Sequence, residues 1–343
     1  MYEQLEDLNV LYDAFKQSIK SVDWKCSIQR FEANVLPELM VIRKSLRCGT
    51  YKQKPFYEFD TYERGKHRHI KSLHISDRVV QRALCDTILI PTLAPYLIYD
   101  NGASIRGKGI DFTRERLRAH LQKYYRKHGN KGYILLVDYK RFFDSIPHDN
   151  ALEALRKRIK DPKVMRLITH MVETFGDGVS LGIGSQISQV IGIYYPTVID
   201  NYCKIVKGCK YYARYMDDLY VIHHDKTFLK QLLIEITEVS ESLGLTVNKH
   251  KTQICRIDKG FVYLKLYHFV TDTGRVVRKP CKANITRERR KLKKLKKKSI
   301  PQKDILESYK SWRGTMLKFD ARRAVSNMDR LYKELYGCRE ARF

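Results

Sequence analysis

The sequence has neither paired cysteines nor long apolar segments. Its eight cysteines are dispersed without a CxxC pair, which argues against a zinc ribbon or a disulfide framework and favours free thiols. The most apolar stretch, residues 87–99, contains Pro91 and Pro95 and is shorter than the roughly 20 apolar residues of a membrane-spanning helix. Three of the first seven residues are acidic, unlike the basic start of a signal peptide. We therefore expect a cytoplasmic protein that does not associate with membranes.

Acidic residues are the minority charge. The 343 residues include 66 Lys and Arg against 38 Asp and Glu, a net charge of +28. A field of this sign attracts polyanions, so nucleic acid is the leading partner class. Because 43% of the residues are hydrophobic, the chain can build folded cores, and its length allows two or three domains.

Three regions differ in pattern. Residues 1–130 mix helical periodicity with short extended pieces, and residues 131–270 alternate strands and helices. Residues 271–343 are helical and basic, and nine of the twelve residues 287–298 are Lys or Arg. We predict one domain for each region, the last a small helical domain with a charged face.

The middle region places acidic residues at the ends of predicted strands. Residues 133–137 (YILLV) are typical of a strand buried on both faces, and Asp138 follows directly. Residues 210–225 (KYYARYMDDLYVIHHD) predict a hairpin with Asp217 and Asp218 at its tip. Apolar periodicity predicts two helices in this region. One begins at Asp161–Pro162, and the other ends at Gly244.

A cluster of these three carboxylates would bind a cation. Hard oxygen ligands favour Mg²⁺, with Mn²⁺ as a substitute, over zinc. Two such ions catalyse in-line phosphoryl transfer, so the pattern indicates nucleotidyl transfer. Taken singly, Asp138 is equally typical of a turn or helix cap, and an Asp-Asp pair at a hairpin tip is usually solvated.

The strings YYARYMDDLYVIHHD and YILLVDYKRFFDSIPH resemble the catalytic motifs of reverse transcriptases. The resemblance implies an α+β right-hand polymerase: fingers with an N-terminal helical extension (1–130), a palm with an antiparallel sheet backed by helices (131–270), and a helical thumb (271–343). It implies that Asp138 and Asp217 ligate two metal ions and that Asp218 completes the cluster. Tyr215 and Met216 would contact the template or primer.

Further residues are assigned to the nucleotide by the same resemblance. Phe143 would be the aromatic gate that excludes a 2′-hydroxyl, although a core position beside Phe142 is the alternative. Lys66 and Arg68 lie in a segment similar to the part of the fingers that binds the triphosphate; alone, they would be solvated surface charges. Lys251, in LGLTVNKHKTQI, would donate a proton to pyrophosphate.

One motif narrows the subfamily. Residues 181–189 (LGIGSQISQ) give the pattern IGxxxSQ at Ile183, Gly184, Ser188 and Gln189, which looks like the enzymes of diversity-generating retroelements within the lineage related to group II introns. These enzymes copy template RNA with errors at adenines, and Gln189 would lie near template and nucleotide. Gln189 can equally be a structural cap. If this assignment holds, we expect a small basic helical accessory protein as a partner.

Primer and template contacts are expected near the C-terminal region. The FLG of the family's primer-grip hairpin appears here as Tyr263-Leu264-Lys265, which leaves the primer contact of Lys265 open. The basic run lies where the family has its thumb, so we expect contacts to the duplex from Arg287, Arg290 and Lys294. A solvated helix face is the alternative.

The predicted function is thus an RNA-directed DNA polymerase that binds template RNA, primer, cDNA and deoxynucleotides. A retron or antiviral-defence reverse transcriptase is a close alternative, although VTDTG at residues 270–274 matches the retron VTG motif only partly. A non-catalytic RNA-binding protein with a polymerase fold is an alternative of another class. An RNA-dependent RNA polymerase is disfavoured by the bulky Phe143.

Overall fold

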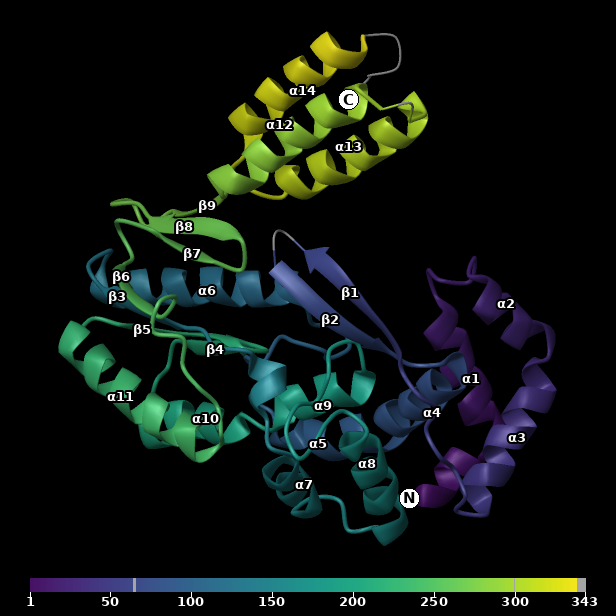
Figure 1. Ribbon diagram of the computed structural model, residues 1–343. Coiled ribbons are helices and arrows are strands. Elements are labelled where there is room, and N and C mark those ends of the chain that lie inside the picture. The colour runs from purple at the N-terminus through teal and green to yellow at the C-terminus, as the bar shows by residue number, and fades with distance from the viewer. Residues whose placement is uncertain (64–65, 299, 338–343) are drawn as a thin grey trace. The chain divides into compact units, whose positions relative to one another are not determined.

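The computed structural model describes residues 1–63, 66–298 and 300–337, with only the backbone for residues 63, 66 and 68. The fold mixes helices and strands, as predicted (Figure 1). The chain divides into two compact units. Unit 1 comprises Met1–Thr113, Val137–Leu219 and Gln231–Thr252, and unit 2 comprises Arg114–Leu136, Tyr220–Lys230 and Gln253–Phe343. The boundaries predicted for fingers, palm and thumb stay predictions.

Unit 1 contains most of the helices and the first hairpin. Strands β1 and β2 pair antiparallel, and α4 packs against α1. Its helices and strands are α1 (Leu8–Ile19), α2 (Cys26–Ala33), α3 (Val35–Arg47), β1 (Tyr57–Glu63), β2 (Lys66–Ser72), α4 (Ile75–Leu84), α5 (Ile90–Leu93), α7 (His148–Arg156), α8 (Pro162–Glu173), α9 (Gln186–Tyr194), α10 (Thr197–Asn201) and β4 (Tyr212–Tyr215).

Four elements contribute residues to both units: α6 (Ile110–His128), β3 (Tyr133–Val137), β5 (Asp218–His223) and α11 (Lys226–Ser242). One sheet has the strand order β4-β5-β3-β6, where β6 is Gln253–Arg256, and β3 and β6 run antiparallel. The predicted strand 133–137 and hairpin 210–225 are therefore confirmed.

The helix boundaries read from the sequence are also confirmed. Asp161 caps α8, because its carboxylate accepts hydrogen bonds from the N–H groups of Lys163 and Val164 at 2.9 and 3.3 Å. Gly244 follows α11 with a φ of 73°, the left-handed conformation that glycine supplies after a helix.

Unit 2 ends in a bundle of three helices that lie side by side (Figure 1): α12 (Lys282–Lys296), α13 (Gln302–Leu317) and α14 (Arg322–Tyr336). It also contains the antiparallel sheet β7 (Phe261–Tyr263), β8 (Leu266–Val270) and β9 (Val276–Pro280). The bundle buries Leu292, Tyr309 and Tyr332, and Trp312 packs against this core. Tyr309 and Tyr332 stack with ring centroids 4.8 Å apart. The basic run thus forms one helix whose apolar side faces a core.

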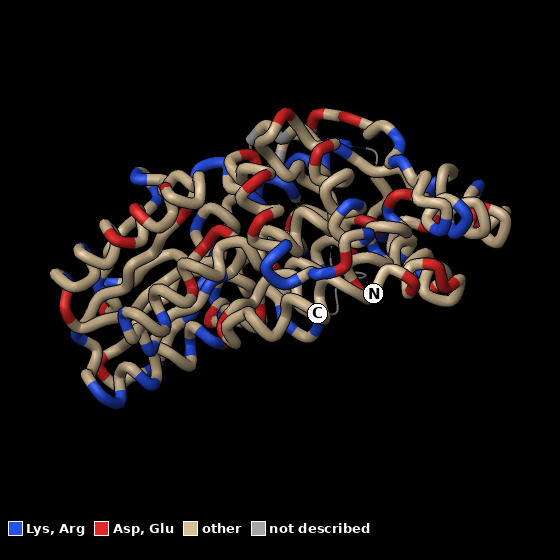
Figure 2. The backbone as a smooth tube through the Cα atoms, turned by 90° about the horizontal axis from the view of Figure 1, so that it is seen from below, with Lys and Arg blue, Asp and Glu red and all other residues tan. Residues whose placement is uncertain are grey.

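Three expectations from composition can be compared with the structure. Lys and Arg recur along the whole backbone, with Asp and Glu between them, so the positive charge is not confined to α12 (Figure 2). The cysteines 26, 48, 85, 203, 209, 255 and 281, all within the described residues, are free thiols. Within the same residues, no helix has the length and apolar character that crossing a membrane requires.

Candidate active site

Asp138 follows β3 and is held by the segment that follows α11. Its carboxylate oxygens both accept hydrogen bonds from Lys251 Nζ at 2.7 Å, and Oδ2 accepts one from Asn248 Nδ2 at 3.0 Å. The backbone N–H of Asn248 donates to the Asp138 carbonyl at 2.7 Å. The Asp138 side chain is 16% exposed, so this carboxylate is partly desolvated and already binds a cationic group. The structure thus brings together the predicted residues Asp138 and Lys251.

The tetrapeptide YMDD forms the tip of the β4–β5 hairpin. Tyr215 is the last residue of β4, Met216 and Asp217 form the turn, and Asp218 is the first residue of β5. Met216 has a φ of 56°, a left-handed conformation that costs an L-residue roughly 1–2 kcal/mol. Such local strain is common at functional sites, where surrounding structure must hold it in place.

A buried ion pair supports this turn. Arg214 and Asp200 are both 0% exposed. Arg214 Nε and Nη2 donate to the two Asp200 oxygens at 2.8 and 2.6 Å, and Arg214 Nη1 donates to the Met216 carbonyl at 3.0 Å. Tyr212 donates from its hydroxyl to Asp200 at 2.6 Å. Burial lowers the pKa of Arg214, but Asp200 outweighs this effect and raises that pKa above its ordinary value.

Arg214 and Asp200 were not among the residues predicted for the site. One signal was available: Tyr212 and Arg214 share a face of β4 because side chains alternate along a strand. An arginine on the same face as a buried tyrosine indicates a buried charge that needs a partner.

Phe143 and Met216 meet at Gly192 of α9. A Cβ atom at Gly192 would lie 3.0 Å from Phe143 Cε1 and 3.3 Å from Met216 Sδ. Phe143 is partly buried and packs edge-to-face on the buried Phe142, with centroids 5.3 Å apart. Glycine has no Cβ, so it fits at position 192 without displacing Phe143 or Met216. The structure therefore places the predicted gate beside the hairpin turn and does not bury it fully.

The IGxxxSQ motif forms the loop before α9 and the first turn of that helix. Gln189 is exposed, and its Oε1 accepts a hydrogen bond from Ser104 Oγ at 3.3 Å. Gly184 has a φ of 111°, and a Cβ there would lie 3.7 Å from the Lys71 carbonyl of β2. The loop thus lies against the β1–β2 hairpin, which contains the predicted triphosphate-binding residues.

Lys66 and Arg68 are placed only in part. Both belong to β2, where Lys66 pairs with Glu63 and Arg68 with Thr61. Their side chains lie outside the described residues, so their triphosphate contact stays a prediction.

The residues that we predicted to contact the primer and the duplex belong to unit 2. Leu264 and Lys265 form the turn between β7 and β8 and have φ values of 44° and 68°. Two successive positive φ angles are typical of a type I′ turn, which normally takes glycine or asparagine. Arg287, Arg290 and Lys294 are exposed on α12.

The described residues include no group of three or more His, Cys, Asp or Glu side chains positioned to hold a metal ion. The donor chemistry nevertheless fits Mg²⁺ or Mn²⁺, because Asp138 holds a cationic group on both oxygens and the two aspartates of the turn supply hard ligands. Binding of metal ions to all three stays a prediction.

Comparison with known families decides the assignment. The family model described as "Reverse transcriptase (RNA-dependent DNA polymerase)" matches residues 51–300. The chain belongs to the reverse transcriptase family. A search of curated proteins finds no match.

Solved structures support the same fold. This reverse transcriptase chain is similar to a telomerase from Candida albicans in complex with a fragment of telomeric RNA, with a TM-score of 0.53 and 12% identity over 80% of this chain and 55% of that one. It is also similar to an apo telomerase from Candida tropicalis truncated from its C-terminal domain, with a TM-score of 0.50 and 13% identity over 71% of this chain and 60% of that one. The chain therefore spans little more than half the length of these relatives.

Proposed function

We propose that this protein is an RNA-directed DNA polymerase that extends a primer with deoxynucleotides on an RNA template. The observation that carries the proposal is the YMDD turn, held by the Arg214–Asp200 pair and packed beside Phe143 at Gly192. Membership of the reverse transcriptase family supports it.

In this proposal Asp138, Asp217 and Asp218 hold two Mg²⁺ or Mn²⁺ ions. Bound ions of this kind activate an attacking hydroxyl and stabilise a leaving oxygen in phosphoryl transfer. Lys251, now paired with Asp138, carries a proton at Nζ that it can donate to the leaving pyrophosphate. Arg214 keeps the turn carbonyl of Met216 fixed and so orients the two aspartates that follow.

Phe143 would select the sugar in this proposal. Its ring is partly exposed, and its position is fixed by Phe142 on one side and Gly192 on another. In this proposal the bulky ring would exclude a 2′-hydroxyl, and the methyl group of alanine would leave space for one. We expect Phe143→Ala to raise ribonucleotide incorporation relative to wild type; unchanged sugar selection would show that Phe143 is not the gate.

The decisive experiment is primer extension on an RNA template with dNTPs and Mg²⁺ or Mn²⁺. We expect product from wild type and none from Asp217→Ala, while Asp177→Ala, which removes an exposed aspartate, extends as wild type does. Binding of RNA by a wild-type protein that yields no product, even with its native RNA supplied, would favour the non-catalytic alternative.

The IGxxxSQ loop supports placement in a diversity-generating retroelement. This finer proposal includes cytoplasmic action and a small basic helical partner protein. Sequencing the extension product tests it: errors concentrated opposite template adenines support it, and uniform errors favour the retron or defence alternative.

A further inference from the structure

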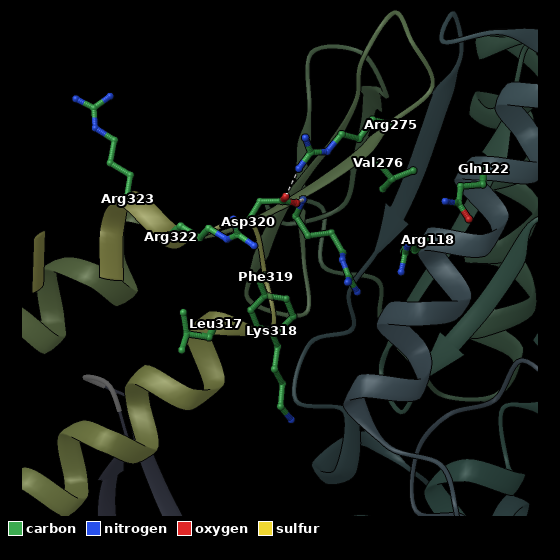
Figure 3. A pocket seen from close by; sticks show the side chains of 11 residues that line it. Arg118, Gln122, Arg275, Val276, Leu317, Lys318, Phe319, Asp320, Arg322 and Arg323 are labelled. Carbon is green, nitrogen blue, oxygen red and sulfur yellow. Dashed lines mark hydrogen bonds and ion pairs between the residues drawn. The ribbon is translucent and has the colours of Figure 1, made fainter. Parts of the chain in front are cut away.

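Unit 2 contains a cavity of about 650 Å³ that includes none of the residues assigned above to catalysis or to the basic helix. Figure 3 shows that three segments line it: α6 carries Arg118 and Gln122, Arg275 and Val276 lie where the β8–β9 turn enters β9, and residues 317–323 run from the end of α13 into the first turn of α14. Because these segments are far apart in sequence, no local motif reveals the cavity.

The lining is strongly basic. Six cationic side chains and one carboxylate, Asp320, surround the cavity; the cations are Arg118, Arg275, Arg278, Lys318, Arg322 and Arg323. A site of one charge sign between low-dielectric walls concentrates oppositely charged ligands. An anionic ligand is therefore expected.

The carboxylates nearby neutralise only part of this charge. Asp320 accepts hydrogen bonds from Arg275 Nη2 at 2.6 Å and from the backbone N–H of Arg278 at 2.9 Å. Glu115 accepts from Arg278 Nη1 at 2.5 Å and from Arg118 Nη1 at 3.3 Å. Within the described part of the chain, Arg322 and Arg323 form no ion pair with a carboxylate. Both are exposed in the first turn of α14.

The volume and remaining lining favour a nucleic acid strand over a small anion. The volume falls within the range of sites that enclose ligands much larger than a single phosphate ion. Phe319 and the 47% exposed Leu317 lie among the arginines, and the Arg278 guanidinium lies 5.7 Å from the Phe319 ring centroid. Basic grooves interleaved with apolar and aromatic groups are typical of single-strand binding, and arginine presents a fork that matches phosphate oxygens.

We propose that this cavity binds the phosphodiester backbone of single-stranded RNA. The proposal concerns unit 2 alone and holds whether or not the protein polymerises DNA. Arg118 approaches the strand from α6 and Arg322 approaches it from α14, whereas the Arg323 side chain points away from the other lining residues in Figure 3. Gln122 supplies a neutral amide that can donate or accept a hydrogen bond with the ribose.

The test compares two double variants of the full chain that lose the same charge. The cavity variant is Arg118→Gln/Arg322→Gln, and the matched control is Lys310→Gln/Lys333→Gln, which changes exposed residues of α13 and α14 outside the cavity. Binding of a labelled oligouridine is measured by fluorescence anisotropy, without nucleotides, at several salt concentrations.

We expect the cavity variant to bind RNA about 10-fold more weakly near 100 mM salt, and its log–log salt slope to fall by about 1.4, since each of the two lost phosphate contacts on a single strand removes about 0.7. The control should stay within about threefold of wild type. Equal losses in both variants, or no loss in the cavity variant, would overturn the proposal.

Two further measurements identify what the cavity binds. Polyglutamate and pyrophosphate are added as competitors at matched charge; if either displaces RNA from wild type but not from the cavity variant, the cavity takes carboxylates or free phosphate and the proposal fails. RNA containing 4-thiouridine is crosslinked to the wild-type protein, which needs no variant to fold. Crosslinks in residues 317–323 support the proposal, and their absence from that segment contradicts it.

Discussion

In two hairpins of this protein, a buried arginine donates a hydrogen bond to a backbone carbonyl of the turn. In the β4–β5 hairpin, Arg214 donates to the turn carbonyl of Met216 at 3.0 Å. In the β7–β8 hairpin, Arg114 donates to the turn carbonyl of Leu264 at 2.6 Å. Both arginines are buried, with 0% and 8% exposure. Each turn contains at least one non-glycine residue with a positive φ, so contacts from the surrounding structure are needed to keep the turn in this conformation.

The surroundings of the two guanidinium groups differ. Arg214 donates two hydrogen bonds to Asp200, and the Arg114 guanidinium lies 5.3 Å from the Phe319 ring centroid. A bidentate carboxylate fixes both the position and the angle of a guanidinium group. In the hairpin that bears the proposed catalytic acids, the arginine that holds the turn is itself held in this way.

The largest effect is expected at Asp200. Asp200→Ala leaves the Arg214 charge buried without its carboxylate, which typically costs about 3–5 kcal/mol. Chemical denaturation followed by circular dichroism measures it. Tyr212→Phe, which removes one hydrogen bond to the same carboxylate, should cost about 2 kcal/mol or less. A double variant Asp200→Leu/Arg214→Met that is as unstable as Asp200→Ala would contradict this explanation.

The second hairpin should respond to acid. Burial lowers the pKa of His268 in β8 from 6.5 to about 4. The unfolded chain binds this proton more readily than the folded chain does. The free energy of unfolding should therefore be unaffected by His268 above pH 6.5 and should fall by about 3 kcal/mol as the pH decreases from 6.5 to 4. His268→Gln should remove that part of the pH dependence of unfolding, whereas His250→Gln, at an exposed position, should retain it. An unchanged pH profile in His268→Gln would contradict the prediction.

Gly192 tests whether the β4–β5 hairpin depends on packing as well as on charge. The Cβ of Gly192→Ala would press on Phe143 and Met216. Displacement by a few tenths of an ångström should lower primer extension about tenfold. Gly314→Ala in α13 is the matched control, since nothing lies within 4 Å of its Cβ; it should leave extension unchanged and stabilise the helix by about 0.5–1 kcal/mol. Equal activity of both variants would show that this contact is not needed.

The smallest effect is expected at Lys265. Lys265→Gly relieves a φ of 68° and should raise the free energy of unfolding by up to about 1 kcal/mol. If the Lys265 side chain binds primer, the same variant should also bind primer–template more weakly. Lys265→Asn, which tolerates the left-handed conformation, separates the two effects; destabilisation by glycine would show that the turn is not strained.

Local patterns were enough to predict the elements that carry the site. The run 133–137, the Asp161–Pro162 helix start and the YMDD turn all follow from residues adjacent in sequence. The face of β4 that Arg214 shares with Tyr212 indicates a buried charge, but its partner Asp200 could not be predicted, because Asp200 belongs to α10 and no local pattern links the two elements. The cavity of unit 2 was missed for the same reason, as its cations come from three separate segments.

Asp320 has a consequence for the sheet edge. In the order β7-β8-β9, strand β9 has one side without a neighbouring strand among the residues that the structure describes. There the Asp320 N–H donates to the Arg278 carbonyl at 2.8 Å, and the Arg278 N–H donates to Asp320 Oδ2 at 2.9 Å. The α13–α14 turn thereby occupies the hydrogen-bonding groups at mid-strand that a second molecule would need for strand addition. A single aspartate thus blocks the middle of this edge against the addition of another strand.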